Sequence, residues 1–251
     1  MSFEPESEFI KDGIRAKLYN RRHEYSAGEA ARDKVSYKSF TGIIGPFGVG
    51  KSTIANELIL FTPMMYSINT TTTRHRKPED PPGFKTANEG VTFSTFREAV
   101  DEGELINYSV IPGGDIYGTF PEGFPATYST GPLLPESIEQ ISKAGFKESH
   151  FVYIVTAGEV WRNFVNKSRR HMPEDRFQNR VNEAIDSITF AQDNTSILQF
   201  VENTEGADGI LKAAKEIHEI TVNNTPSSLS LKQSEVFLAA MRAVAEDLKV
   251  H

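Results

Sequence analysis

The chain has 251 residues, of which 38% are hydrophobic and 24% charged, with a formal net charge of −7 and no cysteine. The lack of cysteine excludes disulfides and thiolate metal sites, and the negative charge argues against nucleic acid or an anionic membrane surface as a partner. No apolar run approaches the ~20 residues of a membrane-spanning helix, and the acidic N-terminus lacks the apolar core of a signal peptide. These features predict a cytoplasmic protein with no nucleic-acid and no membrane partner.

Residues 1–38 precede the first strand candidate and form an N-terminal extension of mixed charge. Ile10, Ile14 and Leu18 recur at helical spacing, which predicts a helix over about residues 8–20. We expect this helix to pack on the outside of the main domain. The alternative is an arm that binds a partner or a second copy of the chain.

A glycine-rich loop follows an apolar strand candidate at residues 40–44 and precedes a helix predicted at residues 52–61. Its sequence matches the phosphate-binding pattern of Gly, four residues, Gly-Lys-Ser/Thr, in the context that this pattern requires. Glycines let successive backbone N–H groups converge on phosphate oxygens, and the helix N-terminus adds partial positive charge. Lys51 would reach the outer phosphates, and the Ser52 hydroxyl would hold Mg²⁺. The predicted nucleotide-binding residues are Gly45, Pro46, Phe47, Gly48, Val49, Gly50, Lys51, Ser52 and Thr53.

A strand predicted at residues 64–68 is followed by hydroxyl side chains and then by basic ones. The guanidinium groups of Arg74 and Arg76 match phosphate oxygens in a bidentate geometry, and Lys77 adds a further positive charge. Because the run follows a strand in a chain that already carries a phosphate loop, it predicts a phosphate-binding turn. A solvated run of surface charge is the alternative.

The next stretch is rich in turn residues, and residues 78–90 are expected to form a loop. A short strand is expected at residues 91–94 and a helix at residues 95–102, with Thr95 as its N-cap. Residues 104–108 then lead to a turn, which is followed by Tyr117, Gly118 and Thr119.

Residues 40–119 resemble guanylate kinases in four pieces that occur in the same order and spacing. The phosphate loop is the first piece, and Thr72-Thr73-Arg74 with a basic residue after it is the second. Residues 103–108 and 116–119 are the third and the fourth. The resemblance implies ATP and Mg²⁺ as cofactors and a small phosphorylated acceptor as the second substrate. It implies an acceptor site made of Thr70, Arg74, Arg76, Lys77, Asn107, Tyr117 and Thr119.

The second half of the chain continues the resemblance more weakly, to about residue 220. A buried strand of a parallel sheet is predicted at residues 151–155, followed by helices at about 160–165 and from 174 to about 191. By resemblance, residues 167–178 form a lid that closes over the donor phosphates. The arginines of the lid and of the helix that follows it, with Lys51, would stabilise the charge of the transferring phosphoryl group. These arginines are Arg169, Arg170 and Arg180; for Arg180 an ordinary surface charge is the alternative.

A last core strand is predicted at residues 196–201 and a helix at about 208–220. By resemblance Asn203, between them, contacts the donor nucleotide; a plain turn residue is the alternative. Residues 221–251 lie beyond the resemblance and carry an amphipathic helix over 233–248, with Val236, Met241 and Val244 among its apolar residues. Its apolar stripe is covered either by the same domain or by a second copy in a possible homodimer.

Three departures from guanylate kinases affect the acceptor site. The family has an acidic residue that reads the guanine edge where this chain has Asn107, and a tyrosine that contacts the acceptor phosphate near Val91. Residues 126–132 lack the paired aspartates of the corresponding strand. The departures leave the phosphate-handling residues intact and remove base-reading ones.

The expected structure is a three-layer α/β P-loop kinase fold with a parallel sheet over residues 39–220, with an acceptor-binding insertion at 68–119 and the lid. The expected function is ATP-dependent phosphoryl transfer to an acceptor such as GMP or dGMP. No side chain is an obvious general base, which suits an acceptor phosphate because its oxygen is already anionic. Two alternatives remain. One is a sugar-phosphate kinase similar to ribose bisphosphate phosphokinase, which has a segment like Leu134-Pro135-Glu136; the other is a non-catalytic interaction module, although such modules usually have a degraded phosphate loop.

Overall fold

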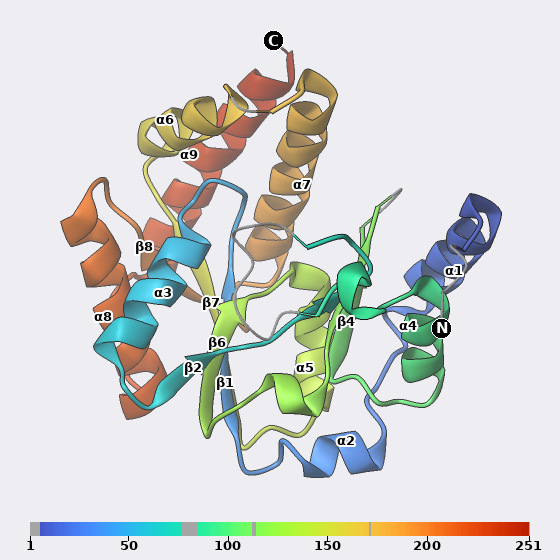
Figure 1. Cartoon of the computed structure of the whole chain (residues 1–251). Helices are drawn as coiled ribbons and strands as arrows, with labels where there is room; N and C mark the ends of the chain where they lie inside the picture. Colours follow the sequence, from blue (N-terminus) through green and yellow to red (C-terminus); the bar gives the residue numbers. More distant parts are fainter. Residues whose placement is uncertain (1–5, 77–84, 112–113, 171, 251) are drawn as a thin grey trace. The chain divides into compact units, whose positions relative to one another are not determined.

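The computed structural model describes residues 6–76, 85–111, 114–170 and 172–250. A five-stranded parallel sheet has the strand order β2-β6-β1-β7-β8, and a three-stranded antiparallel sheet has the order β3-β5-β4 (Figure 1). The strands are β1 (Ser39–Ile44), β2 (Met65–Ser67), β3 (Thr71–Thr72), β4 (Asn107–Val110), β5 (Ile116–Thr119), β6 (Tyr128–Pro132), β7 (Glu148–Val155) and β8 (Gln199–Glu202). The α-helices are α1 (Glu8–Arg21), α2 (Glu29–Asp33), α3 (Lys51–Phe61), α4 (Phe93–Asp101), α5 (Ile138–Lys143), α6 (Gly158–Arg169), α7 (Glu174–Asp193), α8 (Ala207–Asn223) and α9 (Leu231–Val250). Short 3-10 helices lie at Ala87–Glu89, Pro121–Gly123 and Pro135–Ser137.

The chain divides into two compact units. Unit 1 consists of Met1–Phe40, Tyr66–Ser129 and Glu136–Ser149. Unit 2 consists of Thr41–Met65, Thr130–Pro135 and His150–His251. The phosphate loop belongs to unit 2, and the residues predicted to bind the acceptor belong to unit 1.

Unit 2 has helices on both sides of its strands. Thr41 of β1 hydrogen-bonds Thr221 of α8 (Oγ1–Oγ1 2.9 Å), whereas Tyr153 of β7 hydrogen-bonds Ser187 of α7 (3.1 Å). The helix α3 packs against α8, so α3 and α8 form one outer layer and α7 lies in the other (Figure 1). The predicted α/β class with a parallel sheet is thereby confirmed.

Unit 1 is built around its own apolar cluster. The helix α1 packs on α4 and on β4, and Leu18, Phe96, Tyr108 and Ile116 are among the buried residues that these elements share. The side chain of Tyr108 donates to the Leu18 carbonyl (2.9 Å). The N-terminal extension is thus part of the core that carries the three-stranded sheet.

The start of α4 differs from the sequence prediction. A strand at residues 91–94 is wrong, because α4 begins at Phe93; Thr95 is not its N-cap. Thr92 is the cap: its hydroxyl accepts from the Thr95 N–H (3.1 Å), and the Thr95 hydroxyl accepts from the Thr92 N–H (3.0 Å). This reciprocal capping box satisfies two backbone donors and moves the helix start forward.

The C-terminal helix α9 packs against α6 and α7 of its own unit. Met241, Val244 and Leu248 are buried, as the amphipathic pattern predicts, and Leu238, which was not predicted, is buried as well. The exception is Val236, which is 64% exposed. The stripe is therefore covered by the domain itself, and a homodimer stays a prediction.

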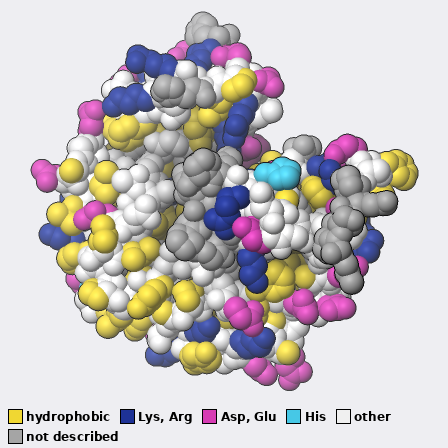
Figure 2. Space-filling model, in the orientation of Figure 1, with side chains coloured by type: hydrophobic (Ala, Val, Ile, Leu, Met, Phe, Trp, Pro, Cys, Tyr) yellow, Lys and Arg dark blue, Asp and Glu magenta, His cyan; other side chains and the backbone are white. Residues whose placement is uncertain are grey.

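Hydrophobic side chains gather on the surface over α3 (yellow at the lower left of Figure 2). Leu60, Phe61 and Met64, at and just after the end of α3, are exposed. The Phe61 ring packs edge-on against the His218 ring at a centroid distance of 5.2 Å.

Among the described residues, no helix has the length and apolar character needed to span a membrane.

Candidate functional site

The loop between β1 and α3 has a backbone that depends on its glycines. Gly45, Gly48 and Gly50 have φ values of 144°, 74° and 94°, which side chains rarely tolerate. At Gly50, the N-cap of α3, an added Cβ would also lie 2.7 Å from the Nδ2 of Asn203. Only glycine fits this position, so the loop keeps the conformation that phosphate loops use to turn their N–H groups inward.

Lys51 lies within this loop. Its ammonium donates to the carbonyl oxygens of Gly45 (2.7 Å) and Pro46 (2.9 Å). Burial, together with the positive charge of Arg180, lowers the pKa of Lys51 to about 8, against a smaller opposing effect of Glu183. The structure thus brings Arg180 of α7 into electrostatic reach of the phosphate-loop lysine.

Ser52 and Thr53 form the exposed first turn of α3. The described residues contain no group of three or more His, Asp or Glu side chains that could hold a metal ion. Mg²⁺ in nucleotide sites is held mostly by water and substrate phosphates, with few protein ligands. A single hydroxyl at Ser52 fits that kind of coordination.

Asn203 ties the end of β8 to the phosphate loop. Its Nδ2 donates to the Val49 carbonyl (2.9 Å), and its backbone N–H donates to the Val155 carbonyl (2.8 Å). The side chain is buried, yet its Oδ1 has no hydrogen-bond partner among the described residues. An unsatisfied buried acceptor costs about 1–3 kcal/mol, which fits a residue whose hydrogen bonding a ligand completes.

A cavity of about 560 Å³ lies beside the loop within unit 2. This volume is in the range of about 300–1,000 Å³ that is usual for small-molecule sites. The walls come from three parts of the chain: the loop and α3, the end of α6, and the segment after β8. They include Gly48, Gly50, Thr53, Phe164, Lys167 and Asn203. The sequence prediction missed Phe164 and Lys167, which only the fold brings to the loop.

Two aromatic side chains hold Phe47 of the loop. Trp161 of α6 donates from its Nε1 to the Phe47 carbonyl (2.9 Å), and its ring is 6.4 Å from the Phe47 ring. Phe177 of α7 packs edge-on against Phe47 at 6.2 Å. The loop is therefore supported from outside by α6 and α7, the same helices that carry the predicted lid arginines.

The predicted lid residues lie at the end of α6 and in α7. Arg169 makes two hydrogen bonds to the Glu174 carboxylate (3.2 and 2.8 Å) and lies over the Phe177 ring, 4.6 Å from its centroid. Arg170 is the exposed C-cap of α6. Arg180 pairs with Glu183 (2.7 Å). Of the three, Arg180 is the one whose charge acts on Lys51.

Three of the predicted acceptor residues share one face of the sheet in unit 1. Asn107 of β4 is paired with Thr119 of β5, and Tyr117 is paired with Thr72 and Ser109. Paired residues in antiparallel strands, and residues two apart, point to the same face. Asn107, Tyr117 and Thr119 therefore lie together, whereas Tyr108 and Ile116 point into the core.

The remaining predicted acceptor residues surround the start of this sheet. Thr70 immediately precedes β3, and its carbonyl accepts from the Lys85 N–H (3.2 Å). The guanidinium of Arg74 donates to the His75 carbonyl (2.8 Å), and that of Arg76 donates to Glu89 (2.9 Å). Lys77 lies outside the described residues.

The hydroxyl groups of Ser109 and Ser137 beside this sheet face were not predicted from the sequence. Ser109 hydrogen-bonds Ser137 (2.8 Å), which comes from a 3-10 helix distant in sequence. Thr72, Asn107, Ser109, Tyr117 and Thr119 give the strands of this face neutral hydrogen-bonding groups, and the Asp115 carboxylate, two residues before Tyr117, accepts from the Thr73 hydroxyl. Val91 packs against the apolar cluster of unit 1, so it serves the core at the position where guanylate kinases have a tyrosine.

Comparisons with known proteins yield one kind of match. No family model and no curated protein matches the chain. Among solved structures, the chain is similar to guanylate kinase from Anaplasma phagocytophilum, with 15% sequence identity over 77% of this chain and 88% of that chain and a TM-score of 0.48. The function must therefore be argued from the residues and geometry of the chain itself.

Proposed function

We propose that the protein transfers the γ-phosphoryl group of ATP to a small phosphorylated acceptor. The proposal rests on the placement of Lys51. This lysine lies in a complete phosphate loop beside a cavity and within electrostatic reach of Arg180. A scaffold would not need a cationic pair at a glycine-restricted loop. Two cations at this place suit the charge that spreads over the transferring phosphoryl group.

The donor side follows from unit 2. The glycine loop and Lys51 would hold the β- and γ-phosphates, and Ser52 would hold Mg²⁺, which neutralises phosphate charge. The nucleoside would occupy the cavity that Phe164, Lys167 and Asn203 line. Arg180, and Arg169 after leaving Glu174, would stabilise the charge of the γ-phosphoryl group in transfer.

The acceptor side follows from unit 1. Arg74 and Arg76 would bind the acceptor phosphate, and the face of Asn107, Tyr117 and Thr119 would bind the rest of the molecule. An oxygen of the acceptor phosphate attacks the γ-phosphorus, the bond to the β-phosphate bridging oxygen breaks, and ADP leaves. No general base is needed, because the attacking oxygen already carries negative charge.

The acceptor is a nucleoside monophosphate such as GMP or dGMP in this proposal, with a sugar phosphate as the second candidate. The sugar phosphate stays a candidate because the paired side chains around Asn107 are neutral. Guanine recognition uses a carboxylate, whereas sugar hydroxyls do not require one. For a sugar phosphate such as ribose 1,5-bisphosphate, Arg74 and Arg76 would bind a phosphate, and the amide and hydroxyl groups of this face would bind the sugar hydroxyls.

One assay tests both the phosphoryl transfer itself and the identity of the acceptor. The full-length protein is incubated with ATP, Mg²⁺ and, in turn, GMP, dGMP, AMP, other nucleoside monophosphates and ribose 1,5-bisphosphate, and ADP is measured. We expect turnover with one class of acceptor and its loss in Lys51→Ala, with Lys232→Ala at an exposed position of α9 as the matched control. Failure of the intact protein both to bind ATP and to turn over any acceptor would refute the kinase function and favour an interaction module.

A further inference from the structure

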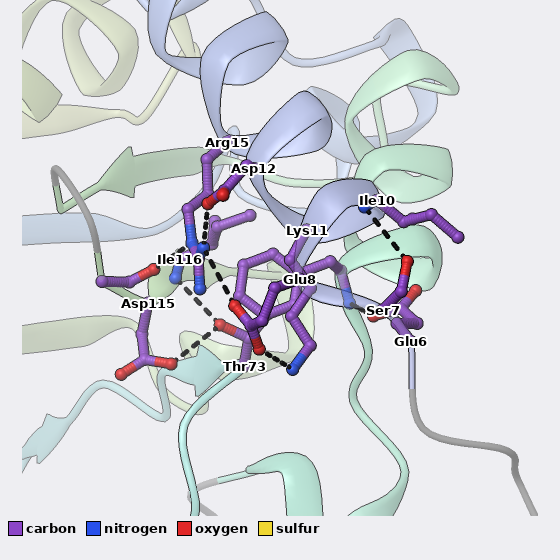
Figure 3. A network of polar contacts seen from close by, with 12 residues as sticks. Glu6, Ser7, Glu8, Ile10, Lys11, Asp12, Arg15, Thr73, Asp115 and Ile116 are labelled. Carbon is purple, nitrogen blue, oxygen red and sulfur yellow. Dashed lines mark hydrogen bonds and ion pairs between the residues drawn. The ribbon is translucent and has the colours of Figure 1, made fainter.

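Arg15 joins the N-terminal helix α1 to the turn between β4 and β5. Its Nε donates to the Gly114 carbonyl (2.6 Å), and its Nη1 donates to Asp12 (2.6 Å) (Figure 3). The guanidinium also lies over the Phe93 ring, 4.6 Å from the centroid. The Arg15 side chain is only 16% exposed, and its bond to Gly114 is partly buried, whereas Asp12 lies at the surface. A planar guanidinium makes all of these contacts at once, which a lysine ammonium cannot do.

The β4–β5 turn that Arg15 contacts is also hydrogen-bonded to Thr73. The Thr73 hydroxyl donates to Asp115 (3.2 Å) and accepts from the Ile116 N–H (3.0 Å), and the Thr73 N–H donates to the Ile116 carbonyl (3.1 Å) (Figure 3). Thr73 immediately precedes Arg74, and Ile116 immediately precedes Tyr117. The turn that Arg15 contacts is therefore hydrogen-bonded to Thr73 and Ile116, the chain neighbours of two residues of the proposed acceptor site.

A second contact from the same extension fixes α4. The Glu6 carboxylate accepts the N–H groups of Phe93 (2.9 Å) and Ser94 (2.8 Å) at the N-terminus of that helix. Phe93 is thus held by Glu6 at its backbone and by Arg15 at its ring. The extension therefore contacts both the start of α4 and the β4–β5 turn.

We propose that Arg15 is a positioning residue for the acceptor site. It holds the β4–β5 turn against α1 and thereby sets the places of Arg74 and Tyr117. The role in acceptor binding rests on the proposed function, whereas the mechanical link to Thr73 does not. The N-terminal extension would then contribute to substrate recognition as well as to packing.

The matched pair of variants comes from one helix. Arg15→Met keeps an apolar stem over Phe93 but removes the donors to Gly114 and Asp12. Arg21→Met removes another arginine of α1, which pairs with Asp101 of α4 at the surface. Arg15→Lys restores charge and one donor without the planar fork.

The first measurement is hydrogen–deuterium exchange of the full-length protein without substrates. We expect Arg15→Met to speed exchange in peptides that cover residues 70–76 and 114–119, Arg15→Lys to do so less, and Arg21→Met to leave them unchanged. Equal exchange in Arg15→Met and the parent protein would overturn the inference whatever the reaction is.

The second measurement is steady-state kinetics with ATP and with GMP or ribose 1,5-bisphosphate, whichever the parent protein turns over. We expect Arg15→Met to raise the KM for the acceptor about tenfold, while the Kd for ATP stays within about twofold, and Arg21→Met to change neither. A parallel loss of ATP affinity, or the same effect in Arg21→Met, would show general destabilisation and refute positioning. If the parent protein neither binds ATP nor turns over any acceptor of the panel, the proposed function fails, and the exchange experiment decides the link on its own.

Discussion

The side-chain amide of Asn203 donates to the backbone carbonyl of Val49 across 2.9 Å, which joins the end of β8 to the phosphate loop. Opposite this bond, Gly50 lies so near that an added Cβ would be 2.7 Å from the same nitrogen. The loop is therefore shaped by a residue about 150 positions further along the chain.

Asn203→Ala should weaken ATP binding. The substitution leaves the buried Val49 carbonyl without its donor, which costs about 1–3 kcal/mol in the folded loop. We expect the Kd for ATP, measured by calorimetry, to rise about tenfold or more. Asn194→Ala is the control, because it removes a similar amide-to-carbonyl bond, to Phe190, at the end of α7. Equal ATP affinity in the two variants would show that Asn203 does not shape the site.

ATP binding should weaken as the pH rises through about 8. Burial and Arg180 lower the pKa of Lys51 to about 8, so the side chain of the free protein is mostly charged below that pH and mostly neutral above it. Phosphate binding favours the ammonium form, so binding above pH 8 must take up a proton. Calorimetry in buffers of different ionisation enthalpy measures this uptake. In Lys51→Arg, whose guanidinium stays charged, the uptake should vanish; its persistence there would assign the proton to another group.

Arg180→Ala should raise the pKa of Lys51 and lower kcat. The charge of Arg180 is one of the two causes that depress the pKa of Lys51, and Glu183 would then be free to favour the ammonium. The fall of ATP affinity with pH should therefore move to higher pH, while loss of a phosphoryl-stabilising charge slows turnover. Arg242→Ala, which removes the ion pair with Glu246 on α9, is the control. A pH profile that does not move would show that Arg180 is an ordinary surface charge.

Trp161→Phe should affect the loop more than it affects the fold. It keeps a ring in the buried site but removes the donor to the Phe47 carbonyl, a bond worth about 0.5–1.5 kcal/mol. We expect a several-fold rise in the Kd for ATP with a modest fall in Tm. Phe200→Leu, another buried aromatic of unit 2 that packs on Tyr153, should lower Tm without changing the Kd. If both variants weaken ATP binding equally, the aromatic support has no special role.

Asn107→Ala should raise the KM for the acceptor and leave the KM for ATP unchanged. Asn107 is buried on the sheet face that it shares with Thr119 and Tyr117, in a unit separate from the phosphate loop. Loss of its hydrogen bonds to the acceptor should cost about 1–2 kcal/mol, or about five- to thirtyfold in kcat/KM. Ser142→Ala, on the helix α5, is the control. An increase in the KM for ATP alone would contradict the assignment of Asn107 to the acceptor site.

The sequence by itself determined the phosphate loop, the α/β class and most strands and helices. These features depend on contiguous residues: glycines at fixed spacing, apolar runs and helical periodicity act over one or two turns of chain. The start of α4 escaped prediction for a related reason. Thr92 and Thr95 are both good capping residues, and the choice between them was made by reciprocal hydrogen bonds and by Glu6, which no local pattern contains.

Only the tertiary structure decided how distant residues cooperate. The coupling of Lys51 with Arg180, the bond from Asn203 to Val49 and the grip of Arg15 on Gly114 each join segments separated by about a hundred residues or more. Such contacts follow from the packing of helices on a sheet, which places side chains by the geometry of the whole core. The motif therefore identified the loop that we propose binds phosphate, and the fold revealed which distant residues hold that loop and the proposed acceptor residues in place.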